Sequence, residues 1–194
     1  MNYNDIEELN LSNQNLNEVP KEVFSFVNLK RLYLYNNNIK HISNKIINFT
    51  KLECLDLRAN CLDKLPFEIG ELKNLKTLYL SNNQIKDLPS SFKKLVKLNK
   101  LIYINNELEK VPDCIYSLTS LERLILRDNK INIIDEKIKS IESLKNLDLK
   151  NNHLSSIPIE ILKLKRLRSL SLQNNRITKL CFKITDFENL KQLN

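Results

Sequence analysis

Apolar side chains return at a fixed spacing along this chain. The segment LDLRANCLDKLP (55–66) recurs as LYLSNNQIKDLP (78–89) and as LDLKNNHLSSIP (147–158). Units of 23 residues begin at Ile6, Leu29, Leu52, Leu75, Leu98, Leu121, Leu144 and Leu167, and a truncated ninth unit covers 190–194. Numbered from each start, places 1, 4, 6, 11, 14, 18 and 21 are apolar in all eight full units, with Tyr103 counted as apolar. Self-similarity at such a period predicts a repeat architecture.

The places within a unit predict its elements. Apolar residues at places 4 and 6 indicate a short strand with one buried face. Place 9 is asparagine in every full unit except the first, which has Gln14, and a short amide suits a turn because it both donates and accepts hydrogen bonds. All five prolines fall on place 15, where a fixed φ suits the exit from that turn. Places 18 and 21 suit one inward-facing helical turn.

The pattern LxxLxLxxNxLxxLPxxIxxLxx resembles the leucine-rich-repeat family over residues 6–194. It is most similar to the 23-residue intracellular class found in Ras-associated scaffold proteins and some bacterial effectors. The resemblance implies an α/β fold of one domain over 1–194, a curved solenoid with a parallel sheet on the concave face and short helical turns on the convex face. It also implies stability through the stacking of neighbouring units.

Several features favour a cytoplasmic protein, or one acting in a host cytoplasm if it is a secreted effector. The N-terminal sequence MNYNDIEELN lacks the basic and apolar pattern of a secretory signal. The four cysteines have no paired spacing and are expected to be free thiols. No apolar run reaches the ~18 residues of a membrane span. We expect a monomer in which Leu190 and Leu193 form a minimal cap, or a partner or further segment covers the eighth unit.

The candidate binding residues lie at places 5 and 7, which should face away from the core. Polar residues are expected there on a solvated sheet, yet units two to six carry aromatic, aliphatic and arginine side chains typical of interfaces. The candidates are Tyr33, Tyr35, Asp56, Arg58, Tyr79, Ile102, Ile104, Ile125 and Arg127. Alternatively, such residues simply suit strands. A bulge at Tyr103 would reverse the facing of Ile102 and Ile104.

Charge suggests a second possible surface. The net charge is +8, and residues 144–194 hold ten basic and four acidic side chains, densest in KLKRLR (163–168). This segment is either a solvated solenoid end or a site for an acidic partner or anionic lipid. Basic and acidic residues alternate over the predicted concave face, which argues against specific nucleic-acid binding.

The sequence predicts no enzyme, cofactor or metal site. His41 and His153 occupy different places about five units apart, and one glycine cannot form a glycine-rich phosphate loop. We therefore expect a non-catalytic protein-protein interaction module, an adaptor or an effector, that binds a protein partner on the concave face. The alternatives are a basic scaffold that binds anionic lipid or nucleic acid through its C-terminal repeats, or a structural spacer or fragment of a larger protein.

Overall fold

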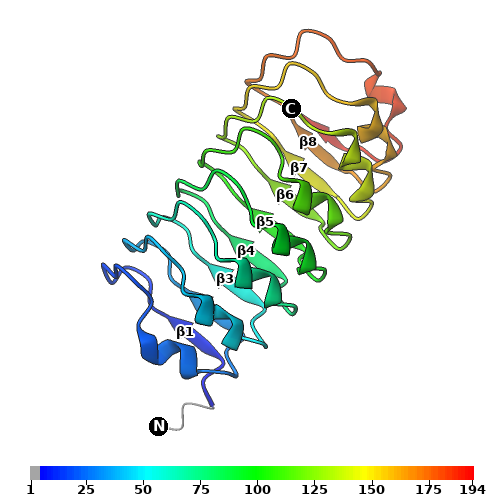
Figure 1. Cartoon of the computed structure of the whole chain (residues 1–194). Helices are drawn as coiled ribbons and strands as arrows, with labels where there is room; N and C mark the ends of the chain where they lie inside the picture. Colours follow the sequence, from blue (N-terminus) through cyan, green and yellow to red (C-terminus); the bar gives the residue numbers. More distant parts are fainter. Residues whose placement is uncertain (1–4) are drawn as a thin grey trace.

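The computed structural model describes residues 5–194, which form a solenoid with one open sheet of nine parallel strands in sequence order. The strands stack side by side, with β1 at one end of the array and β8 towards the other (Figure 1). The strands are β1 (Glu8–Asn10), β2 (Arg31–Tyr33), β3 (Cys54–Asp56), β4 (Thr77–Tyr79), β5 (Lys100–Ile102), β6 (Arg123–Ile125), β7 (Asn146–Asp148), β8 (Ser169–Ser171) and β9 (Gln192–Leu193).

Short 3₁₀ helices form a second row along the array (Figure 1). They are η2 (Lys21–Ser25), η3 (Asn44–Asn48), η4 (Phe67–Glu71), η5 (Ser90–Lys94), η6 (Asp113–Ser117), η7 (Glu136–Ser140), η8 (Ile159–Lys163) and η9 (Ile184–Asp186). The helical turns expected at places 18 and 21 are therefore 3₁₀ turns, which suit such short segments.

The 23-residue spacing sets the register of the sheet. Leu32 pairs with Leu55, and Leu55 with Leu78, so the same place meets itself on every neighbouring strand. These leucines are almost fully buried, and the buried apolar residues form one continuous core. Each unit shares its buried face with the units on either side, which is why stacking stabilises a repeat that could not fold alone.

No bulge interrupts the fifth unit. Ile102 pairs with Tyr79 on one side and Ile125 on the other, in unbroken register. Tyr103 points into the core, where it is fully buried, and its hydroxyl donates a hydrogen bond to the Ile85 carbonyl 3.2 Å away. The alternative in which Ile102 and Ile104 turn inward is therefore excluded, and the core accepts a tyrosine because its polar atom has a partner.

The asparagine at place 9 joins each turn to the turn before it. Asn83 donates from Nδ2 to the carbonyls of Leu57 and Leu80, both 3.0 Å away, and its Oδ1 accepts from the backbone N–H of Leu62. The same bridge recurs at every place-9 asparagine from Asn37 to Asn175. Gln14 occupies this place in the first unit, where the described residues contain no earlier turn to bridge.

A second asparagine, at place 8, allows the backbone to turn. This place has a positive φ in all eight full units, between 50° and 60°. Asparagine tolerates that left-handed conformation better than most residues. It is replaced by Asp128 in one unit and by Ala59 in another, so Ala59 is held in a conformation that alanine rarely adopts.

The prolines at place 15 begin the 3₁₀ helices. Pro66, for example, is the N-cap residue of η4, and its carbonyl accepts from the N–H of Ile69. In two units without proline, Ser43 and Asp135 take this position and cap the helix with their side chains, accepting from the backbone N–H of Lys45 and Lys137. The sequence thus uses two different devices to start the same turn.

The last strand, β9, pairs with β8 and brings Leu193 beside Leu170. Beyond it, the N–H of Leu172 donates to the Asn194 carbonyl. Leu172, Ile177 and Phe187 remain partly exposed, whereas the residues at the same places of the sixth unit are fully buried. These fully buried residues are Leu126, Ile131 and Ile141. The final unit covers the core less completely than the central units do.

Candidate functional site

Side chains at places 3, 5 and 7 project from the side of the sheet opposite the core, and we call this surface the open sheet face. The alternation of a strand produces it, because places 4 and 6 point inward. Five of the candidate residues are half-buried on this face. These are Tyr33, Tyr35, Tyr79, Ile102 and Ile104. Burial raises the pKa of the Tyr33 phenol, which stays neutral in the physiological range.

Asp56 and Arg58 form an ion pair on this face, at β3 and the residues that follow it. Two nitrogens of the Arg58 guanidinium donate to the Asp56 carboxylate, with Nε 2.9 Å from Oδ1 and Nη2 bonded to Oδ2. The arginine lies over Asp56, which is only 1% exposed, so the predicted exposure of Asp56 is wrong. These hydrogen bonds raise the pKa of the Arg58 guanidinium above its ordinary value. Asp56 therefore orients Arg58 through these hydrogen bonds.

Arg58 also lies between two tyrosines. Its Cζ is 4.9 Å from the centre of the Tyr79 ring and 5.6 Å from that of Tyr35. Lys100 also contacts Tyr79: its Nζ is 4.9 Å from the centre of the Tyr79 ring and donates to the phenol oxygen 3.0 Å away. Cations over aromatic faces are attracted by the ring quadrupole. Tyr35, Arg58, Tyr79 and Lys100 thus hold one another in a defined arrangement on β2–β5 and the residues that follow these strands.

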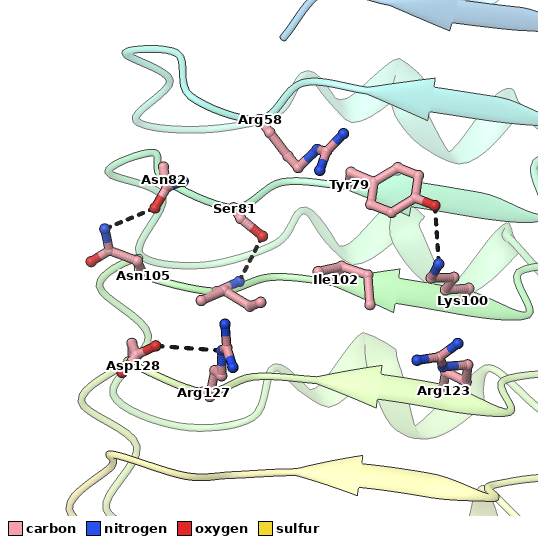
Figure 2. A pocket seen from close by; sticks show the side chains of 11 residues that line it. Arg58, Tyr79, Ser81, Asn82, Lys100, Ile102, Asn105, Arg123, Arg127 and Asp128 are labelled. Carbon is pink, nitrogen blue, oxygen red and sulfur yellow. Dashed lines mark hydrogen bonds and ion pairs between the residues drawn. The ribbon is translucent and has the colours of Figure 1, made fainter. Parts of the chain in front are cut away.

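A hollow of about 720 Å³ lies beside this cluster, over β4–β6. Ile102 is at its centre, and four cationic side chains surround it (Figure 2). The cations are Arg58, Lys100, Arg123 and Arg127. Asp128 is its one acidic lining residue, 3.6 Å from Arg127 Nε. We call this region the basic hollow.

Two candidate positions on the face are less accessible than the sequence predicts. Ile125, like Asp56, is buried, with 8% of its surface exposed. Ser81 beside the hollow is also buried, and its hydroxyl accepts from the N–H of Ile104 3.2 Å away. Ile125 therefore supports the floor of the face, while Ile102, Ile104 and Arg127 line the hollow itself.

Lys100 and Arg123 were absent from the predicted site because the prediction considered only places 5 and 7. Both occupy place 3, which alternation puts on the same side of the strand as place 5. The register pairs them directly across β5 and β6. The signal that would have found them is the cation at place 3 in two consecutive units.

The other chemically reactive residues lie apart from one another. His41 is exposed and 3.9 Å from Asp63, and His153 is exposed in a later unit. All four cysteines are free thiols. Over residues 5–194, no three His, Cys, Asp or Glu side chains gather closely enough to hold a metal ion. No helix in that range combines the length and the apolar character that crossing a membrane requires.

The basic segment near the C-terminus lies largely apart from this face. Lys163 ends η8, and Lys165 and Arg166 follow it as exposed side chains. Lys165 forms an ion pair with Glu188 of the next unit. Part of the positive charge of residues 144–194 is thus compensated within the protein.

Models of leucine-rich repeats match nearly the whole sequence. One, described as a leucine-rich repeat region, matches residues 54–136; a second matches 5–62 and 119–177; a third matches 166–192. The chain belongs to the leucine-rich-repeat family. No sequence among the curated proteins matches it.

Solved leucine-rich-repeat proteins share this fold. A leucine-rich-repeat protein of Leptospira interrogans is 33% identical, with a TM-score of 0.85 over 100% of this chain and 55% of its own. An internalin C2 from Listeria monocytogenes is 24% identical, with a TM-score of 0.84 over 99% of this chain and 81% of its own, and indicates the fold alone. This leucine-rich-repeat chain thus spans little more than half of the Leptospira protein.

A plant receptor is also similar. The leucine-rich-repeat ectodomain of the membrane receptor kinase GASSHO1/SCHENGEN3 from Arabidopsis thaliana is 32% identical, with a TM-score of 0.77 over 91% of this chain and 22% of that one. That ectodomain was solved in complex with CASPARIAN STRIP INTEGRITY FACTOR 2.

Proposed function

We propose that this chain is a non-catalytic protein-binding module, an adaptor or an effector, whose open sheet face holds a protein partner. The observation that carries the proposal is the cluster of Tyr35, Arg58, Tyr79 and Lys100 beside the basic hollow. Tyrosine and arginine dominate binding hot spots because they combine apolar contact area with directed polar groups. On this sheet they are already ordered before a partner arrives, which lowers the entropy cost of binding.

The candidate residues have different parts in this proposal. Tyr33, Tyr35, Tyr79, Ile102, Ile104 and Arg127 contact the partner. Arg58 contacts it as well, and Asp56 keeps Arg58 in place from beneath. Ile125 supports the floor. The family generally mediates protein-protein interaction, and the complex of the plant ectodomain is an example of a leucine-rich-repeat array that holds a partner.

The fold alone does not require this composition. Tyrosine and isoleucine suit strands wherever they occur, but the outer units build the same places from Asn10, Ser12, Ser171 and Gln173. With these polar residues, β1 and β8 still pair with their neighbours in the same register as the central strands: Asn10 lies beside Tyr33, and Ser171 beside Asp148. The aromatic and aliphatic side chains of the central units are therefore best explained by contact with a partner.

The proposal is tested by capture of a partner from an extract of the cells that make the protein. Replacing Tyr79 and Arg127 with alanine should weaken capture at least about tenfold, equivalent to about 1.4 kcal/mol. The melting temperature should change little, because Arg127 is exposed and Tyr79 half-buried. The matched control replaces Lys93 and Lys139, exposed residues of η5 and η7. An equal loss from the control would show that the open sheet face is not the binding surface.

A further inference from the structure

Two cations on the open sheet face lack the partners that similar residues have. Lys30 and Arg31 pair with Glu7 and Glu8 of the preceding unit. Lys76 likewise pairs with Glu53 at 2.9 Å, and Lys145 with Glu122 at 2.7 Å. Each of these cations, at place 2 or 3 of its unit, is compensated by a glutamate of the preceding unit.

Lys100 and Arg123 break this arrangement. Within residues 5–194, neither forms an ion pair with a carboxylate, and the only bond of Lys100 Nζ runs to the Tyr79 hydroxyl. They are also direct cross-strand neighbours on β5 and β6. Like charges placed opposite each other destabilise a sheet, and nothing in the packing of the solenoid requires this pair. An anion between them would turn the repulsion into attraction.

We propose that the basic hollow recognises an acidic segment of a protein, with a carboxylate seated between Lys100 and Arg123. Neighbouring strands lie ~4.8 Å apart, so one carboxylate can accept hydrogen bonds from side chains on both. The cations of Arg58 and Arg127 border the same hollow but already have Asp56 and Asp128 as partners. This inference rests on the proposed protein-binding function and specifies the chemistry of the partner.

The surroundings favour a protein segment over a nucleic acid. Ile102 and Ile104 line the hollow with half-buried apolar surface, and Tyr79 adds an aromatic edge. An acidic segment that carries apolar side chains can pack those side chains against this surface while its carboxylates pair with the cations. A nucleic acid needs a continuous row of cations for its phosphates, whereas the cross-strand neighbours of Lys100 and Arg123 on β4 and β7 are the uncharged Thr77 and Asn146. The charge of the face suits a short acidic stretch.

The test measures binding of a rhodamine-labelled, glutamate-rich peptide with interspersed leucines by fluorescence anisotropy at about 0.1 M salt, where screening acts over about 10 Å. A peptide with glutamine in place of every glutamate is the probe control. Wild-type protein should prefer the glutamate peptide by about tenfold or more. The Lys100→Met and Arg123→Gln double variant, which keeps the apolar parts of both side chains, should lose that preference. The Lys93→Met and Lys139→Met variant removes the same charge from the 3₁₀ helices and should bind normally.

Three outcomes would overturn the inference. The first is equal binding of the glutamate and glutamine peptides by wild-type protein. The second is the same loss in both double variants, which would indicate a general charge effect. The third is that an oligothymidylate of equal charge binds as tightly and loses affinity in the same variant, which would mean a site for any polyanion. If the Lys100 and Arg123 variant still captures a partner that the Tyr79 and Arg127 variant loses, only the acidic-segment inference fails and the proposed function stands.

Discussion

Asn106 illustrates the most repeated interaction of the protein. It is buried, its Nδ2 donates to the carbonyls of Leu80 and Ile104, and its Oδ1 accepts from the N–H of Ile85. The carbonyl of Leu80 and the N–H of Ile85 belong to the preceding unit. A single amide therefore satisfies backbone groups of two units and ties them together.

Replacing Asn106 with alanine should lower the free energy of unfolding by about 1–3 kcal/mol, because buried backbone groups lose their partners. Chemical denaturation measures the change. The matched control is Gln84→Ala, at an exposed turn position of the preceding unit that lies outside the positive-φ places. A change at Asn106 within the error of the denaturation curve would show that water satisfies these groups equally well.

Ala59 offers the opposite experiment. Its φ is +50°, and it interrupts a row of place-8 amides in which Asn36 donates to Asn13 and Asn105 donates to Asn82. Ala59→Asn should stabilise the protein by about 1 kcal/mol, because asparagine tolerates this conformation and can join Asn36 to Asn82. The melting temperature reports the change. Ala59→Val, which adds a β-branched side chain at positive φ, should destabilise it, and a stabilising valine would contradict the explanation.

At the scale of the elements, close packing between η4 and η5 depends on Gly70, the one glycine of the chain. A Cβ atom on Gly70 of η4 would lie 2.2 Å from the Ser91 carbonyl oxygen of η5. Ser91 is buried and its hydroxyl donates to the Phe67 carbonyl, so η5 has little freedom to retreat. The glycine thus permits two backbones to approach closely.

Gly70→Ala should therefore destabilise the protein by about 1–3 kcal/mol, the usual cost of forcing extra volume into a packed site. Lys93→Ala, at the same place of the next unit, is the control and should be nearly neutral because Lys93 is exposed. Denaturation curves of both variants measure the difference. Equal stability of the two variants would mean that η4 and η5 can separate without cost.

Much of the repeat array could be predicted from the sequence, because the burial of each residue follows from its apolar character and its place in the 23-residue period. Leu55 and Leu78 lie where their spacing predicts, and the place-9 asparagines occupy the turns. The left-handed place 8 was not predicted, since Asn13 and Asn36 resemble ordinary turn residues until their backbone angles are known. The burial of Asp56 beneath Arg58 could not be predicted either. The alternation of a strand predicts on which side of the sheet a side chain lies, but not which neighbouring side chain covers it.

For the whole molecule, stability should vary along the array. Units in the middle pack against a complete neighbour on both sides, whereas the last complete unit, 167–189, is followed among the described residues only by β9. Repeat arrays of this kind unfold from their weaker units, since each unit contacts only its neighbours. Exposure of Leu172 and Ile177 identifies the C-terminal units as the weaker end.

Backbone amides in 167–194 should consequently exchange with deuterium well before those in 75–130. Mass spectrometry of peptides from the exchanged protein measures this order. Dilution should leave it unchanged if the protein is a monomer. Uniform protection up to β9 in a dilute sample would show that the last strand and Phe187 cover the core adequately.

The unbroken register of the sheet has a consequence for inheritance. Every place meets its own counterpart one unit away, from β1 through β8. A gene that gains or loses one complete set of 23 codons would therefore leave the joins on both sides matched. Any other length would shift leucines out of the core. Duplication and deletion can lengthen or shorten such an array in whole steps, and each new strand adds one more row of side chains on which selection can act.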